Sequence, residues 1–154
     1  MIMNGLKSES EKKFFCKFCK ENRLKLFVVA LKVLHDEAAA EDAVLSCFTN
    51  LAKAFEQYSH LSPKELSQMC CSVVWCIAHN MAMAHSLQNV KSNATDSSLT
   101  EEEKQLLILK YVLELKNKQI GELLGISEFV IYKKISTSQK KLPQYTEDIE
   151  YAKH

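Results

Sequence analysis

Glycine and proline are scarce in this chain, which has three Gly and two Pro among 154 residues. Each short strand of a β-sandwich or barrel needs a turn-forming residue to reverse the chain, so this scarcity argues against both folds. The content of 47% hydrophobic and 25% charged residues is that of a globular protein and excludes collagen-like and disordered chains. We therefore expect an all-α fold.

Arginine is nearly absent as well, because Arg23 is the only one among 20 basic residues. Bidentate guanidinium contacts to guanine are therefore not expected to dominate any nucleic-acid recognition. The net charge of +1 also means that such a role must come from local clustering of lysine.

Long apolar runs are missing too. A bilayer helix needs roughly 20 apolar residues, and the run from Leu26 to Leu34 is interrupted by Lys32. Residues 1–20 lack the apolar segment of a signal peptide. We expect a cytoplasmic protein with no membrane insertion, in which the six cysteines are most simply thiols.

Enzyme motifs are also lacking. The chain has no Gly-rich phosphate loop, no His-Glu-x-x-His motif and no evident Ser or Cys nucleophile with its base, so we expect no catalytic residue and no cofactor. One metal alternative stays open. Cys16 with Cys19, and Cys76 with His79, are pairs at helical spacing that together offer four zinc ligands. Their apolar flanks favour packed helix faces and no metal.

A polar segment divides the chain into two strongly periodic parts. Residues 86–99 are rich in Ser, Asn, Thr and Asp and predict a linker whose flexible-coil span is about 20 Å. We expect two small helical domains, residues 1–85 and 100–154, joined by this linker. They should move independently unless another contact holds them.

The first domain is expected to contain three or four helices. The clearest begins near Asp36, where acidic residues suit the positive end of a helix dipole. Residues 14–34 are apolar on more than one side, which fits one central helix or two helices broken near Glu21 and Asn22. Ser62-Pro63 predicts another helix start, because proline loses no hydrogen bond in the first turn.

The second domain begins with a helix-start signal. Thr100 is followed three residues later by Glu103, the arrangement of a capping box. An apolar helix through Leu106 and Val112 is expected to follow.

Two shorter helices close the pattern, at residues 118–124 and from 128 to about 142. Gly125 is expected to supply the left-handed backbone that ends the first, and Ser127 to cap the second. The small Gly121 allows the two helices to cross closely. This spacing predicts a helix-turn-helix.

Positive charge is concentrated around this motif. Residues 104–142 contain eight Lys and three Glu, a local charge of +5 in a chain of net +1. Such clustering is what contact with backbone phosphates requires, although a Lys-rich helix is also commonly a solvated face. If the last helix enters the major groove, the residues expected near base edges are Glu128, Phe129, Tyr132, Lys133 and Ser136. The residues expected at phosphates are Lys116, Lys118, Lys140 and Lys141, and Ser127 and Lys134 complete the DNA-binding set.

At this point the sequence resembles a known family, the bacterial RNA polymerase sigma factors of the sigma-70 superfamily, in particular the short extracytoplasmic-function type. LLILKYVLELKNKQIGELLGISEFVIYKKISTSQKKL is similar to the promoter-reading helix-turn-helix of that family. HDEAAAEDAVLSCFTNLAKAF and IAHNMA resemble two segments of its first domain. The resemblance covers nearly the whole chain, with the segments in the family's order.

The resemblance implies a protein that binds core RNA polymerase and promoter DNA, with an anti-sigma factor as a possible further partner. The residues that match the polymerase-binding helix are Glu41, Asp42, Val44, Leu45, Phe48 and Leu51. Trp75, His79 and Asn80 match the part of the family that faces the separated strands. Trp75 can stack on an unpaired base, but a lone Trp at helical spacing is more often a core residue.

The chain also departs from the family pattern. Leu45 stands where Gln is usual, His79 replaces Arg, and Phe129 and Val130 occupy positions where Gly and Thr are common. These differences keep a second function open: a sigma-like helical regulator that acts through protein partners, with weak or no DNA binding.

Overall fold

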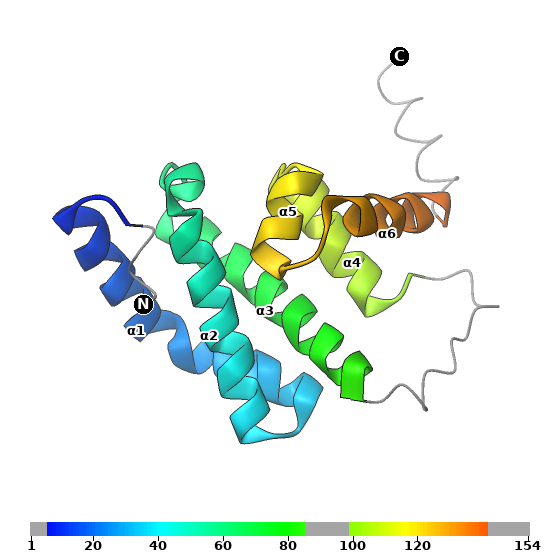
Figure 1. Ribbon diagram of the computed structural model, residues 1–154, viewed down its shortest axis with the longest axis horizontal. Coiled ribbons are helices and arrows are strands. Elements are labelled where there is room, and N and C mark those ends of the chain that lie inside the picture. Colours follow the sequence, from blue (N-terminus) through cyan, green and yellow to red (C-terminus); the bar gives the residue numbers. More distant parts are fainter. Residues whose placement is uncertain (1–5, 86–98, 142–154) are drawn as a thin grey trace, which may run out of the picture.

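The computed structural model describes residues 6–85 and 99–141 (Figure 1), and within them the chain is helical with no strand. The all-α expectation is confirmed. In chain order the elements are α1 (Glu9–Leu34), α2 (Glu37–Lys53), the 3-10 turn η2 (Phe55–Tyr58), α3 (Pro63–His85), α4 (Glu101–Leu107), the π-helical turn η3 (Ile108–Val112), α5 (Asn117–Leu124) and α6 (Glu128–Lys140). Residues 86–98 of the predicted linker and Leu142 lie outside the described residues.

The N-terminal lobe, residues 6–85, is built from α1, α2 and α3, which lie side by side in Figure 1. Their shared core contains an aromatic cluster in which the ring of Phe15 meets those of Phe48 and Phe55 edge-on, at centroid distances of 6.3 and 5.8 Å. Of the two possibilities for residues 14–34, the structure has one helix, because α1 runs without a break through Glu21 and Asn22.

The helix starts predicted in this lobe are confirmed. Asp36 is the N-cap of α2, and its carboxylate accepts a hydrogen bond of 2.8 Å from the backbone N–H of Ala39. Pro63 is the first residue of α3. Ser62 and Glu65 exchange hydrogen bonds in a capping box, with the Glu65 backbone donating to the Ser62 hydroxyl.

The C-terminal lobe, residues 99–141, has the predicted helix-turn-helix. Gly125 adopts the left-handed conformation, with φ 71° and ψ 33°, and Ser127 caps α6 by accepting from the backbone N–H of Val130. A Cβ placed on Gly121 would lie 2.6 Å from the carbonyl oxygen of Ile126, so the close crossing needs a glycine there. The predicted capping box of Thr100 and Glu103 is also present.

The expected helix through Val112 differs in its second half. The α-helix ends at Leu107, and the chain continues as the π-helical turn η3. Wider turns of this kind insert one extra residue per turn, which changes the face that the following side chains present. As a result Leu109 is buried, whereas Tyr111 and Val112 are exposed.

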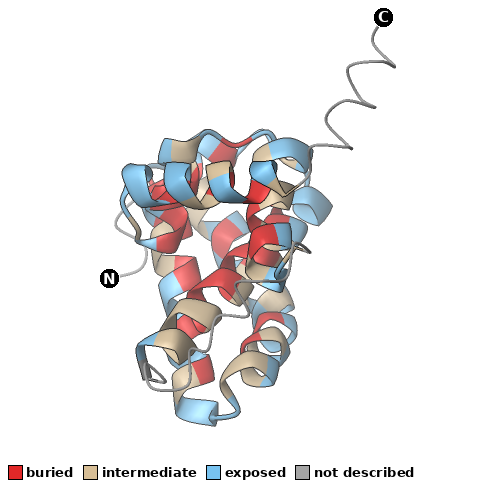
Figure 2. Ribbon diagram, turned by 90° about the vertical axis from the view of Figure 1, so that its right-hand side faces the viewer, coloured by how far each residue is buried: buried red, intermediate tan, exposed pale blue. Residues whose placement is uncertain are grey.

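The two lobes pack against each other through α2, α3, α4 and α5. The amide of Asn50 in α2 donates a hydrogen bond of 2.8 Å to the carbonyl oxygen of Leu123 in α5. Buried apolar residues of both lobes belong to one connected hydrophobic core, and Figure 2 shows buried segments through the middle of the molecule. The contact that would hold the lobes together is thus present, while the domain division at residues 86–99 stays a prediction.

Candidate nucleic-acid interface

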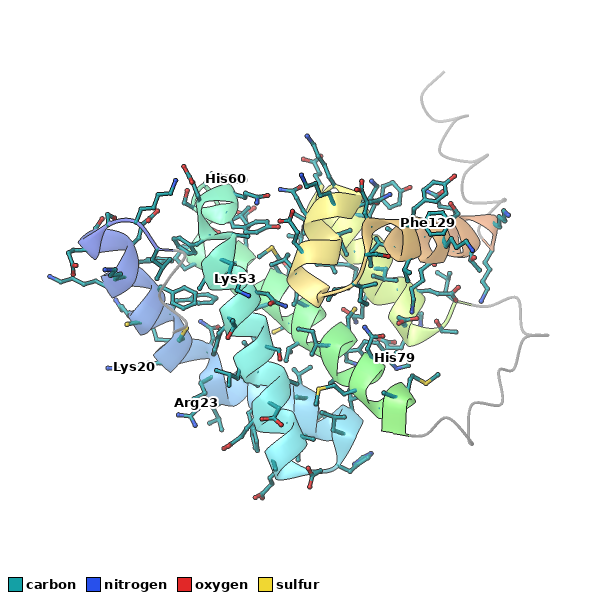
Figure 3. All side chains as sticks on the ribbon, in the orientation of Figure 1. Lys20, Arg23, Lys53, His60, His79 and Phe129 are labelled. Atoms are coloured by element: carbon teal, nitrogen blue, oxygen red, sulfur yellow. The ribbon has the colours of Figure 1, made fainter. Side chains whose placement is uncertain are left out.

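Helix α6 presents one face to the core and the opposite face to solvent. Ile131, Ile135 and Ser138 are buried against the rest of the C-terminal lobe. On the outer face, 63% of Phe129 and 57% of Tyr132 are exposed. Figure 3 shows Phe129 on the side of α6 that faces away from the N-terminal lobe. An outer face of this kind is free to approach a duplex.

The residues predicted to lie near base edges share this face. Glu128, Phe129, Tyr132 and Lys133 are exposed, and Ser136 is half-buried. Ser127 is exposed, but its hydroxyl is occupied as the cap of α6. The structure brings these side chains together at one end of α6, and their contacts with bases remain predictions.

The lysines predicted to bind phosphates, together with Lys134 of the wider DNA-binding set, fall into two groups. Lys116, Lys118 and Lys140 are exposed. Lys134 and Lys141 are half-buried and form ion pairs with the N-terminal turn of α4, at 2.9 Å to Glu102 and 2.8 Å to Glu103. Their ammonium groups are therefore already neutralised inside the lobe.

The Glu103 carboxylate is the most enclosed part of this arrangement. Burial by itself raises the pKa of Glu103, but hydrogen bonds from Lys141 and from Thr100 outweigh burial and hold the pKa below its usual value. Glu103 is therefore charged at neutral pH, and it holds Lys141 at the end of α6.

Lys133 forms no ion pair with a carboxylate of residues 6–85 or 99–141 and lies over an aromatic ring. Its Nζ is 5.0 Å from the centroid of the Phe129 ring, a cation–π contact at i, i+4 spacing. The contact orders both side chains on the outer face and keeps a positive charge near the ring.

The residues expected to face separated strands lie on α3, beside the C-terminal lobe. The ring of Trp75 packs against the core and stacks on His79 at a centroid distance of 5.0 Å and an interplanar angle of 11°. His79 Nε2 is 3.9 Å from Glu102 of α4, and Figure 3 places His79 between α3 and the C-terminal lobe. Asn80 is half-buried. Trp75 thus makes the contacts of a core tryptophan, and its stacking on an unpaired base stays a prediction.

The predicted polymerase-binding helix is α2. Glu41, Asp42 and Leu45 are exposed, and Leu45 has 51% of its surface accessible. Val44, Phe48 and Leu51 are buried, and Leu51 has no accessible surface, so it supports α2 from the inside.

A groove of about 430 Å³ runs between α1 and α2. Val44, Leu45 and Phe48 line one side, and α1 supplies Arg23 and Phe27. Sequence reasoning missed this α1 wall, although the i, i+4 spacing of Arg23 and Phe27 on a helix with several apolar sides was a signal for it. Figure 3 shows Arg23 projecting from α1. The groove joins apolar and charged groups, which suits a protein partner.

No metal centre is formed by the described residues, since no three of their His, Cys, Asp and Glu side chains come together. The four residues weighed as zinc ligands, Cys16, Cys19, Cys76 and His79, are therefore not gathered at one place. All six cysteines are free thiols. Burial raises the pKa of Cys19 and of Cys76 to about 12, so both remain protonated at neutral pH.

No helix of the described residues combines the length and the apolar character required to cross a membrane.

Comparison with known proteins bears on the C-terminal lobe. Residues 97–142 match the family model for sigma-70, region 4. The matched segment includes α4, α5 and α6 and the turn between α5 and α6. Comparison with curated proteins and with solved structures gives no match. The matched residues coincide with the helix-turn-helix of the C-terminal lobe. The C-terminal lobe is thus similar to sigma-70 region 4.

Proposed function

We propose that the chain is a sigma factor whose N-terminal lobe binds core RNA polymerase and whose C-terminal lobe directs the polymerase to promoter DNA. The observation that carries the proposal is the exposed outer face of α6, on a helix-turn-helix that matches sigma-70 region 4. The chain acts by positioning the polymerase and needs no chemistry of its own.

In this proposal the first turns of α6 enter the major groove. Phe129 and Tyr132 meet base edges there, with Glu128, Lys133 and Ser136 beside them. Lys116 just before α5, Lys118 on α5, and Lys140 at the end of α6 hold phosphates on either side. Contacts to phosphate supply most of the affinity and make it depend on salt, whereas the groove contacts supply selectivity.

The N-terminal lobe has the other half of the function. Exposed Leu45 beside Glu41 and Asp42, over the groove between α1 and α2, supports a docking surface for a polymerase subunit. His79 contacts Glu102 of α4 at 3.9 Å. In this proposal His79 leaves Glu102 when Trp75, His79 and Asn80 meet separated strands.

The proposal is tested by copurification with core polymerase and by run-off transcription on a library of promoters. We expect polymerase retention and transcription of a subset of templates. Replacing Leu45 by Glu should abolish retention of polymerase, because it places a negative charge beside the apolar residues Val44 and Phe48 that line the groove.

DNA binding is tested separately with the double variant Lys133→Glu, Lys140→Glu. Both lysines are exposed, and neither is paired with a carboxylate among the residues that the structure describes, so the variant should fold normally and lose retention on DNA. The matched control is Lys13→Glu, Lys64→Glu, which changes the net charge equally on exposed positions of α1 and α3. Equal retention of both variants would contradict the proposed DNA face.

A second candidate function is a helical regulator that acts through protein partners. The internal ion pairs of Lys134 and Lys141 favour it, because they occupy two lysines of the predicted DNA-binding set. Retention of polymerase without transcription of any template would support this candidate.

A further inference from the structure

We infer that α6 recognises thymine through the methyl group that this base exposes in the major groove, with Phe129 and Tyr132 as the reading residues. The inference rests on the proposed function, since it assigns a base to the same face of α6. The inference has two grounds. One is the set of side chains that α6 exposes, and the other is the scarcity on α6 of the residue types that read other bases.

Most of the usual readers of purines are missing from the exposed start of α6. Arginine or lysine reads guanine with two hydrogen bonds, and Asn or Gln reads adenine in the same way. Of these residue types the start of α6 offers Lys133, whose ammonium lies over the Phe129 ring. The helix Glu128–Lys140 contains no Arg and no Asn. Its single Gln139 lies near the C-terminal end, where its amide donates to the hydroxyl of Tyr111. Base edges at the first two turns must therefore be read by other chemistry.

Aromatic surface takes the place of those readers. Phe129 and Tyr132 are three residues apart, hence on the same face of the helix, and both have more than half of their surface exposed. In the major groove the thymine methyl is the apolar group that bases present, and an exposed Phe is a known type of contact for it. Burying the two rings against methyl groups would remove apolar surface from water on both partners.

The charged neighbours fit the same arrangement. Lys133 holds its ammonium over the Phe129 ring, 5.0 Å from the centroid, which keeps the ring on the outer face and leaves the charge near the DNA backbone. Glu128, at the first position of α6, would be repelled by phosphates, and its carboxylate can accept a hydrogen bond from the N4 amino group of cytosine or the N6 amino group of adenine. The preferred strand is therefore rich in thymine, with cytosine or adenine at its edge.

The experiment uses the full chain and compares two duplexes that differ only in methyl groups. A duplex is first selected from a random library, and its thymines are then replaced by deoxyuracil, which pairs identically and lacks the methyl. We expect the dissociation constant to rise about fourfold for each contacted methyl removed, the equivalent of one buried carbon. The variant Phe129→Ala should lose most of this difference while keeping the salt dependence of binding. Leu24→Ala, at an exposed position of α1, should keep the full difference.

The outcomes separate the inference from the proposed function. Equal affinity for the thymine and uracil duplexes, with retention that still depends on Lys133 and Lys140, overturns methyl reading and leaves DNA binding intact. Failure to retain any duplex overturns both. A methyl effect that survives in both Phe129→Ala and Tyr132→Ala overturns the assignment to these two rings.

Discussion

Replacing Gly121 by Ala tests whether α5 and α6 cross as closely as described. Alanine favours a helix over glycine by about 1 kcal/mol, so the substitution would stabilise an uncrowded helix. Here the new Cβ would lie 2.6 Å from the carbonyl oxygen of Ile126 and 3.4 Å from the backbone nitrogen of Glu128. Both are backbone atoms of the turn, so relief requires α6 to move.

Overpacking of this kind costs about 1 to 3 kcal/mol. Subtracting the gain in helix propensity leaves an expected net loss of up to about 2 kcal/mol in the free energy of unfolding. With a urea slope of about 2 kcal/mol/M, the unfolding midpoint should fall by up to about 1 M. Circular dichroism at 222 nm during a urea titration measures this shift.

The control is Ser46→Ala on the exposed face of α2, which gains helix propensity without a close neighbour backbone. Its midpoint should rise slightly or stay the same. If the midpoint of Gly121→Ala also rises, the crossing is wider than described and the turn does not depend on glycine at this position.

Three further predictions concern the lobe contact, a helix cap and the response to acid. Asn50→Ala removes the hydrogen bond to the Leu123 carbonyl and should lower the free energy of unfolding by about 1 kcal/mol, with faster hydrogen exchange in α5. Asp36→Ala removes the cap of α2 and should cost about 1 kcal/mol in urea unfolding, whereas Asp36→Ser should restore most of it. Because the pKa of Glu103 is lowered in the folded state, its stabilising contribution is present above the unfolded-state pKa and is lost as pH falls through the folded-state pKa. Glu103→Gln should therefore flatten the acid end of a stability profile measured by thermal unfolding, and an unchanged profile would contradict the role given to the Lys141 ion pair.

Local signals in the sequence predicted much of the fold. Asp36, Thr100 and Ser127 cap helices within three residues of their own position, and Gly125 ends α5 through its own backbone. Interactions of such short range can be read from the order of residues. The length of α1 was less determined, because its apolar residues on several sides fit either one buried helix or two.

Contacts between distant segments were beyond this kind of reasoning. Asn50 and Leu123 are 73 residues apart in the chain, and the hydrogen bond between them links the two lobes. The outer face of α6 was predictable because Ile131 and Ile135 define the inner one. The ion pair of Lys134 with Glu102 could not be predicted, because the sequence does not distinguish an exposed lysine from a paired one. The conversion of the end of α4 into a π-helical turn also left no simple sequence signal.

The ion pairs of Glu102 and Glu103 with Lys134 and Lys141 affect how many lysines are available to neutralise phosphates. In the free protein Glu102 and Glu103 occupy the places beside Lys134 and Lys141 that nucleic acid would otherwise take. Each lysine that neutralises a phosphate adds about 0.9 to the logarithmic slope of affinity against salt. The three proposed phosphate contacts, Lys116, Lys118 and Lys140, would give a slope of about −2.7, and the addition of Lys134 and Lys141 would give about −4.5. The number of small ions displaced when a duplex binds would therefore reveal whether the ion pairs of Glu102 and Glu103 with Lys134 and Lys141 persist or break.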